Sequence, residues 1–141
     1  MKKCAGIYKR KKQFFIHASS KTTAHWWIIW EPILALPETC DDQELDQAIR
    51  TALEGSRVDV PHPRPEDFET VGAGLYLLAG VKSWQGFANG ASSVDVEQEG
   101  TRISLSPLRK DGAGFGPDDW RQVVVLDASS ELGAAVRKLL P

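Results

Sequence analysis

Short apolar stretches separated by polar or turn-forming residues run along the whole chain, and they predict a protein with several strands. Residues 7–8 and 14–18 are apolar on either side of a basic run, a pattern typical of a hairpin with a charged tip. Residues 25–30 are aromatic or β-branched without polar alternation, which predicts a strand buried on both faces. We expect Pro32 and Pro37 to end that strand.

A second hairpin is predicted further along, where residues 93–97 and 102–106 alternate between apolar and polar side chains around a tight reversal. The apolar runs 74–79 and 123–126 are short, and we interpret each as a further strand, the first of them buried. The glycine-rich segment 111–117 predicts a flexible loop between the hairpin and the last strand.

A helix is predicted from Asp41 onward, because Asp41 and Glu44 have the spacing of a capping box. Gly55 stands where a left-handed residue would end this helix. Five apolar residues between them recur at helical spacing: Leu45, Ala48, Ile49, Ala52 and Leu53. The pattern predicts one amphipathic helix that packs on the sheet through these five side chains.

Two further helical segments complete the pattern. Ser83 can cap a short turn that carries Trp84 and Phe87, and Ser129 or Ser130 can cap a closing amphipathic helix. Hairpins together with packed helices predict the α+β class, with a mainly antiparallel central sheet and helices packed against it.

A length of 141 residues is that of one domain, so we expect a single domain over residues 1–141. Hydrophobic residues at 42% and charged residues at 26% are typical of a globular protein rather than a disordered one. The apolar runs fall short of the ~20 residues of a membrane helix, and no secretory signal follows the basic N-terminus. We therefore expect a cytoplasmic protein without membrane contact, with Cys4 and Cys40 reduced.

The charges are distributed unevenly along the chain. Seven of the 17 basic residues lie in residues 1–21, which hold no acid, and the remainder carries ten basic and 19 acidic residues, a net charge of −9. Such a surface favours basic partners. We place the contact in an acid-only stretch between Lys21 and Arg50, at Asp41, Asp42, Glu44 and Asp46, which we expect to face outward. Helix capping and solubility explain the same four residues equally well.

The candidates for metal binding are weak. His17, His25 and His62 and the two cysteines lack the close pairing that zinc ligands usually show, so no metal or cofactor is expected. A simpler interpretation is that His25 packs beside Trp26 in the core, while His17 and His62 lie at strand ends or in loops.

No catalytic motif is visible either. The chain has no GxSxG elbow, and the glycines of 112–116 precede a predicted strand without the Lys-Ser/Thr pair of a phosphate loop. Neighbouring acids on exposed segments usually remain solvated. We therefore expect no enzyme activity, and an acid–base pair that includes His17 or His62 is left as a third hypothesis.

The basic N-terminal segment supports an alternative function, that of a small nucleic-acid-binding protein. Lys9–Lys12 would contact phosphates, and Tyr8, Phe14 and Phe15 could stack on bases. The acidic remainder opposes this hypothesis, because a nucleic-acid binder is expected to show a basic face over its fold. We therefore favour a protein partner and expect no direct contact with nucleic acid.

Five tryptophans are many for this length, and aromatic residues are enriched at binding hot spots. A tryptophan within a strand, such as Trp27, more often belongs to the core. Trp84 and Trp120 lie beside polar turns, so we choose them as interface candidates.

Residues 81–87, Gly90-Ala91, Val94 and the stretch 101–107 resemble a family of bacterial contact-dependent growth inhibition immunity proteins. The likeness covers mainly residues 71–108. It implies a protein made alongside a large surface-displayed toxin, whose C-terminal domain, commonly a nuclease, it binds as a heterodimer inside the cell. Contact residues differ among such proteins, so none carries over, and the matching residues are expected to be fold elements: Lys82, Ser83, Trp84, Phe87 and Pro107.

Overall fold

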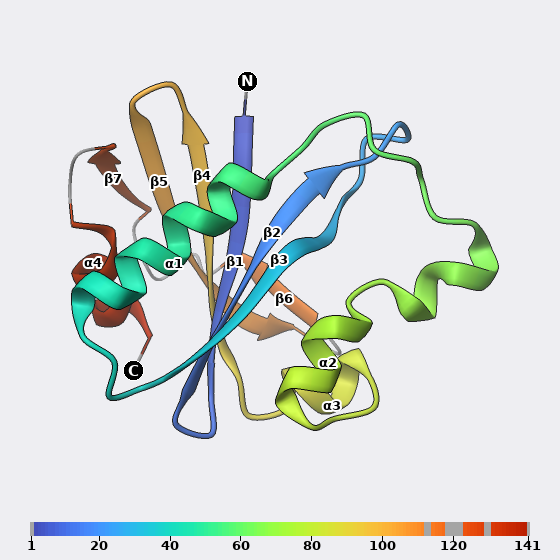
Figure 1. The fold of residues 1–141 in the computed structure, drawn as a ribbon, viewed down its shortest axis with the longest axis horizontal. Helices are drawn as coiled ribbons and strands as arrows, with labels where there is room; N and C mark the ends of the chain where they lie inside the picture. Colours follow the sequence, from blue (N-terminus) through green and yellow to red (C-terminus); the bar gives the residue numbers. More distant parts are fainter. Residues whose placement is uncertain (1, 112–113, 118–122, 129–130, 141) are drawn as a thin grey trace.

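A computed structural model describes residues 2–111, 114–117, 123–128 and 131–140 of the chain, and one antiparallel sheet dominates these residues (Figure 1). Its strands follow the order β3-β2-β1-β4-β5-β6, and β7 also pairs with β5. The seven strands in the described residues are β1 (Lys2–Arg10), β2 (Gln13–Lys21), β3 (Trp27–Pro37), β4 (Ser92–Glu99), β5 (Arg102–Asp111), β6 (Gly114–Pro117) and β7 (Val124–Asp127).

Helices cover both faces of this sheet, which confirms the α+β class. The helical segments are α1 (Asp42–Gly55), the 3-10 turn η1 (Pro65–Thr70), α2 (Ala73–Ala79), α3 (Trp84–Ala88) and α4 (Leu132–Leu139). In Figure 1, α1 lies across the strands with α4 beside its N-terminal end, whereas α2 and α3 lie together near β3 and β6. Among the described residues, every helix is too short or too polar to cross a membrane.

Strand alternation divides the core between the two faces. The larger cluster, beneath α1 and α4, takes one side of β1 and β2 through Ala5, Ile7, Phe14 and Ile16. The opposite side carries Tyr8 and Phe15, which pack with Leu75 of α2 and Phe87 of α3. The sheet is therefore the shared wall of two apolar clusters, and α1 belongs to the larger one.

The predicted basic hairpin is confirmed, with a shorter tip than expected. Arg10 pairs with Gln13, so the turn consists of Lys11 and Lys12 alone. Both lysines have positive φ, 48° and 65°, the combination that a tight hairpin turn of the primed type requires. Lys9 and Arg10 belong to β1.

The capping box and the five buried apolar residues of α1 are also confirmed. The expectation of a left-handed Gly55 is wrong, because Gly55 closes the helix and the next residue, Ser56, is extended with φ −65°. Glycine is needed here for space: a Cβ would lie 2.9 Å from the carbonyl oxygen of Glu31 and closer still to the ring of Pro32.

The aromatic stretch was expected to be a core strand, and this prediction is wrong. Within the described sheet β3 is an edge strand that pairs with β2, and none of its residues is fully buried. Trp26 precedes the strand and is 58% exposed, and Trp27 is 37% exposed. The strand also passes through Pro32 and ends at Pro37, because an edge strand tolerates a residue without an N–H donor.

Two other predictions fail in the second half of the chain. Residues 74–79 lie in α2 rather than in a buried strand, and this short helix exposes 82% of Leu77. The predicted loop 111–117 is largely strand, since β5 continues to Asp111 and β6 pairs with it. Residues 112–113 lie outside the described residues. A short apolar run does not distinguish helix from strand, and glycine content alone does not exclude pairing.

The remaining elements agree with the sequence, apart from the start of α4. The second hairpin, the strand β7 and the short helix α3 are present, and Ser83 Oγ accepts the α3 capping hydrogen bond. The closing helix begins after Glu131, which is its N-cap residue and makes no side-chain capping bond. The predicted caps, Ser129 and Ser130, lie outside the described residues.

Candidate interaction surfaces

The first turns of α1 bring together four carboxylates, those of Asp41, Asp42, Glu44 and Asp46, which we call the acidic turn. The first three are exposed, and Asp46 is half-buried. Asp41 Oδ1 accepts from the Glu44 amide (2.7 Å), and Glu44 Oε1 accepts from the Asp41 amide (3.4 Å). The two members of the capping box are the part of this cluster that makes no bond to α4.

Asp46 faces α4 instead of solvent, contrary to expectation. Its Oδ1 accepts from the amides of Leu132 (2.7 Å) and Gly133 (3.3 Å), so it caps α4 from a neighbouring helix. Its Oδ2 accepts from Arg50 Nε (2.7 Å). Gly133 permits this close approach, because a Cβ there would collide with the α1 backbone at Asp42.

Asp42 is also engaged by α4. Its Oδ1 accepts from Arg137 Nε (2.7 Å), and this hydrogen bond raises the pKa of Arg137. The guanidinium also donates to the carbonyl oxygens of Glu38 (2.8 Å) and Cys40 (2.6 Å), and it lies 5.2 Å from the ring centre of Phe14. Two of the four carboxylates of the acidic turn, those of Asp42 and Asp46, therefore join α1 to α4.

Of the two tryptophans chosen from the sequence, Trp84 is not among the exposed ones of the described chain. Trp84 is half-buried among Tyr8, Phe87 and Phe115, at ring-centre distances of 5.8 to 5.9 Å. Trp120 lies outside the described residues. Trp26 and Trp27 are exposed, which sequence reasoning missed; the small and polar residues 19–24 before them are a signal of this turn.

The three histidines differ from expectation in two cases. His17 is buried in the middle of β2, where Nδ1 donates to the carbonyl oxygen of Ala18 (2.8 Å) and Nε2 accepts from the Tyr8 hydroxyl (2.9 Å). Burial lowers the pKa of His17 to about 4, so the ring is neutral near pH 7. His25 is exposed, with φ 66°, rather than packed in the core. His62 lies in a loop, as predicted.

Neither candidate for acid–base chemistry has a carboxylate partner among the described residues. His17 bonds to Tyr8 and to a backbone oxygen, and His62 Nδ1 lies 2.9 Å from Thr22 Oγ1. The nearest strongly shifted carboxyl on the same face of the sheet is Asp95, where burial raises the pKa to about 6. Asp95 is separated from His17 by a strand, since both pair with Gly6 of β1.

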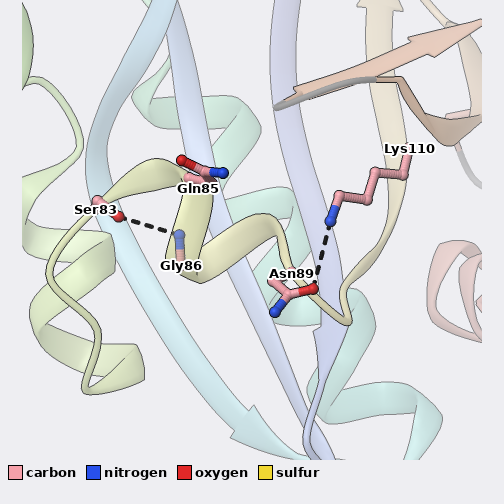
Figure 2. Close-up of a pocket in the computed structure, with 5 residues that line it drawn as sticks. All are labelled: Ser83, Gln85, Gly86, Asn89 and Lys110. Atoms are coloured by element: carbon pink, nitrogen blue, oxygen red, sulfur yellow. Dashed lines mark hydrogen bonds between the residues drawn. The ribbon is translucent and has the colours of Figure 1, made fainter.

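A hollow of 410 Å³ lies between α3 and β5, and Figure 2 shows the residues that line it. Its lining residues are Ser83, Gln85, Gly86, Asn89 and Lys110. Ser83 Oγ accepts from the Gly86 amide (3.1 Å), and Lys110 Nζ donates to Asn89 Oδ1 (3.5 Å). These groups provide hydrogen bonds without a nucleophile next to a base. Across the described residues, no three His, Cys, Asp or Glu side chains are grouped to hold a metal.

A second hollow, of 300 Å³, lies beside the hairpin tip and is lined by residues 9–12 and 90–92. Lys11 and Lys12 are exposed, whereas Arg10 is buried and donates to the Phe87 carbonyl oxygen (3.1 Å). Lys9 lies 3.6 Å from a carboxylate oxygen of Glu38. Two of the four basic residues of this run are thus used within the fold, and two face outward.

Comparison with known proteins identifies the relatives of this chain. The family model for CDI immunity proteins, CdiI, matches residues 3–141. No curated protein matches the sequence. A solved protein of unknown function from Neisseria meningitidis has a TM-score of 0.76 at 22% identity, over 99% of this chain and 93% of that one. A chain of the CdiA-CT/CdiI toxin and immunity complex from Yersinia pseudotuberculosis also has a TM-score of 0.76, at 18% identity over 99% and 95%. Both likenesses show a shared fold.

Proposed function

Because the chain belongs to the family of CDI immunity proteins, we propose that it neutralises a cognate toxin by binding the toxin's C-terminal domain as a heterodimer in the cytoplasm. The family match over nearly the full length carries this proposal, and the Yersinia structure of similar fold is itself a toxin and immunity complex. The protein acts by covering its partner, with no catalysis and no cofactor of its own.

The charge of the chain supports a nuclease as the toxin. Outside residues 1–21 the net charge is −9, and a nuclease presents a basic surface to its nucleic acid substrate. An acidic inhibitor is attracted to the same surface and competes with that substrate. The acidic turn contributes to docking, and the accessible carboxylates of Asp41 and Glu44 contribute most.

The acidic turn makes up part of the contact. A standard protein interface buries about 1,600 Å² and draws on roughly 20 to 30 residues per partner. Trp84 and Trp120 are further proposed contacts, chosen because tryptophan is enriched at binding hot spots. Trp84 would contribute its exposed part, since the rest of the ring packs on Tyr8 and Phe87.

Co-expression with the toxin domain encoded directly upstream tests the proposal. A tagged toxin domain should co-purify with this chain at a one-to-one ratio, and cells that make both should grow normally. The proposal is lost if the domain stays toxic in the presence of this chain, or if the upstream gene encodes no large secreted protein.

A charge removal tests the acidic turn. Asp41→Asn and Glu44→Gln keep the capping contacts, and Asp42 and Asp46 are left unchanged because both are bonded to α4. The association rate with the toxin domain should fall at low salt. A control variant, Glu66→Gln with Glu99→Gln, removes the same total charge elsewhere on the surface. Equal loss in the two variants would show that net charge matters rather than this patch.

One observation favours a second function, nucleic-acid binding by the hairpin tip. Lys11 and Lys12 occupy left-handed positions that Asn and Gly usually fill, so lysine is kept there at some conformational cost. Their exposed ammonium groups could contact phosphates. A gel shift with RNA and DNA that weakens with salt, and disappears in a Lys11→Asn, Lys12→Gly variant, would support this function. Absence of any shift would dismiss it.

A further inference from the structure

The connection between β2 and β3 leaves two consecutive tryptophans exposed. We call residues 22–27 the tryptophan loop; its Trp26 is 58% exposed and its Trp27 is 37% exposed. Single apolar residues on a surface are normal, whereas two consecutive exposed tryptophans are uncommon outside binding sites. In Figure 1 the loop projects at the upper right, beside the segment that follows α1.

The backbone of the loop is fixed from within by Thr22. This residue is fully buried, and its Oγ1 accepts from the amides of Ala24 (3.2 Å) and Trp26 (3.3 Å). The Thr22 amide donates to the Trp26 carbonyl oxygen (2.7 Å), and the His25 amide donates to the Thr22 carbonyl oxygen (2.9 Å). The tryptophans are therefore presented by an ordered turn.

The segment after α1 holds the loop from outside. Val60 links to both sides of Thr22: its amide donates to the Lys21 carbonyl oxygen (3.1 Å), and its own carbonyl oxygen accepts from the Thr23 amide (2.9 Å). The Trp26 ring meets the His62 ring edge-on at 5.4 Å and lies 5.7 Å from the Phe68 ring. These contacts orient Trp26 and still leave more than half of it exposed.

Two left-handed residues accompany this arrangement. His25 has φ 66° and Asp59 has φ 57°, and neither is glycine. Such residues cost of order 1–3 kcal/mol each and are concentrated at functional sites. His25 immediately precedes Trp26, so its conformation sets the direction in which the ring leaves the backbone.

The charges around the loop fit a basic partner. The carboxylates of Glu31 and Asp59 are exposed and make no ion pair within the described part of the chain. Two nearby guanidinium groups are engaged within the fold: Arg57 donates to the carbonyl oxygens of Glu54 (2.6 Å) and Ser56 (3.0 Å), and Arg64 pairs with Glu66 and Asp67. Lys21, the cross-strand partner of Trp27, makes no ion pair among the described residues and is the cation that a basic partner would meet. An exposed tryptophan ring attracts Lys and Arg side chains, and the net negative charge of the chain outside residues 1–21 adds to that attraction.

We propose that the tryptophan loop is the hot spot of the toxin interface, where Trp26 and Trp27 receive a Lys- or Arg-bearing surface of the toxin domain. This inference rests on the proposed function and names the surface that carries it. Preordering matters here, because ring positions fixed before binding lose little further entropy on association.

The test compares the affinities of two variants for the purified toxin domain. Trp26→Ala should weaken binding by at least about 30-fold, the loss that marks a hot spot. The matched control is Leu77→Ala on α2, whose side chain is 82% exposed, and its affinity should change by less than about 3-fold. Both variants should keep a thermal midpoint close to that of the wild type, because both side chains are mostly exposed.

A second measurement uses the unmodified chain and is independent of any effect on folding. Oxidative footprinting should modify Trp26 in the free protein and spare it in the complex. If the wild type binds the toxin domain but Trp26→Ala binds within 3-fold of it, or if Trp26 stays oxidisable in the complex, the hot spot is overturned and the proposed function stands. If the wild type does not bind the domain at all, both fall.

Discussion

The acidic turn and the tryptophan loop lie near opposite ends of α1, and they use their side chains in opposite ways. In the acidic turn, Asp42 and Asp46 are bonded to α4 through Arg137 and through the amides of residues 132–133. In the tryptophan loop, the internal bonds are made by Thr22 and by the backbone, so the large side chains remain outside. The acidic turn uses two of its carboxylates for bonds within the fold, whereas the tryptophan loop leaves its aromatic side chains exposed.

The comparison shows that a cluster of charged residues is not always available for binding, because its carboxylates can be bonded within the fold. A side chain contributes most to binding when its position is fixed without its binding groups being occupied. Asp46 is fixed and occupied, whereas Trp26 is fixed and exposed. The two regions can still serve one interface, because the 14 residues of α1 span about 20 Å, within the reach of a standard contact surface.

The largest effect on stability is expected from Asp46→Ala. The amides at the start of α4 lose their acceptor and Arg50 loses an ion-pair partner, so the free energy of unfolding should fall by about 2–3 kcal/mol. Asp46→Asn keeps an acceptor and should cost less than about 1 kcal/mol. Urea denaturation measures both. An Ala variant as stable as the wild type would remove the contrast, because Asp46 would then be available for binding.

Thr22→Val is expected to have the next largest effect, and it tests the other region. Valine keeps the shape of the side chain and removes the hydroxyl that serves the Ala24 and Trp26 amides. Stability should fall by about 1–2 kcal/mol, and these two amides should exchange hydrogen faster. Thr22→Ser is the control and should retain protection. Unchanged exchange in the Val variant would mean that Thr22 does not order the loop.

A smaller effect is expected from Asp41→Ala, which removes the N-cap of α1. The Glu44 amide loses its acceptor at 2.7 Å, and the cost should be about 1 kcal/mol in a denaturation experiment. Asp41→Asn can still accept and should be within a few tenths of wild type. A cost in the Asn variant as large as in the Ala variant would point to the charge and the helix dipole rather than to the cap.

Local sequence patterns correctly predicted the helices and hairpins that depend mainly on interactions between residues close together in the chain. The helix α1 followed from its capping box and its i, i+3, i+4 apolar residues. The first hairpin followed from apolar residues on either side of a basic run, and the second followed from alternation around a tight reversal. Residues 74–79 failed because a short apolar run fits either helix or strand. Left-handed glycines at 72 and 80 flank the helix that formed, and this helix packs on β3.

The sequence predicted which charged residues could lie on the surface, but it did not predict how they are arranged there or what they contact. The acids around residues 41–46 could be counted, but the bond between Asp46 and the Leu132 amide joins residues 86 apart in the chain. The exposure of Trp26 and Trp27 depends on β3 lying at the edge of the sheet, which alternation within the strand does not reveal. A stretch that looked like core thus became the most exposed aromatic surface of the described chain.

Glu44→Gln should have the smallest effect on stability. It separates the part that Glu44 plays in capping α1 from the part that its charge plays in attracting the toxin domain. Its carboxylate is exposed and makes a long capping contact with the Asp41 amide (3.4 Å) that glutamine can also make, so the change in unfolding free energy should stay below about 0.5 kcal/mol. If the acidic turn steers the toxin domain, the association rate should drop measurably at low ionic strength and recover toward the wild-type rate above physiological salt. The dissociation rate should not change, since a rim charge acts before contact. A slower association that persists at high salt would instead place Glu44 in direct contact with the toxin, and the contrast with the tryptophan loop would then disappear.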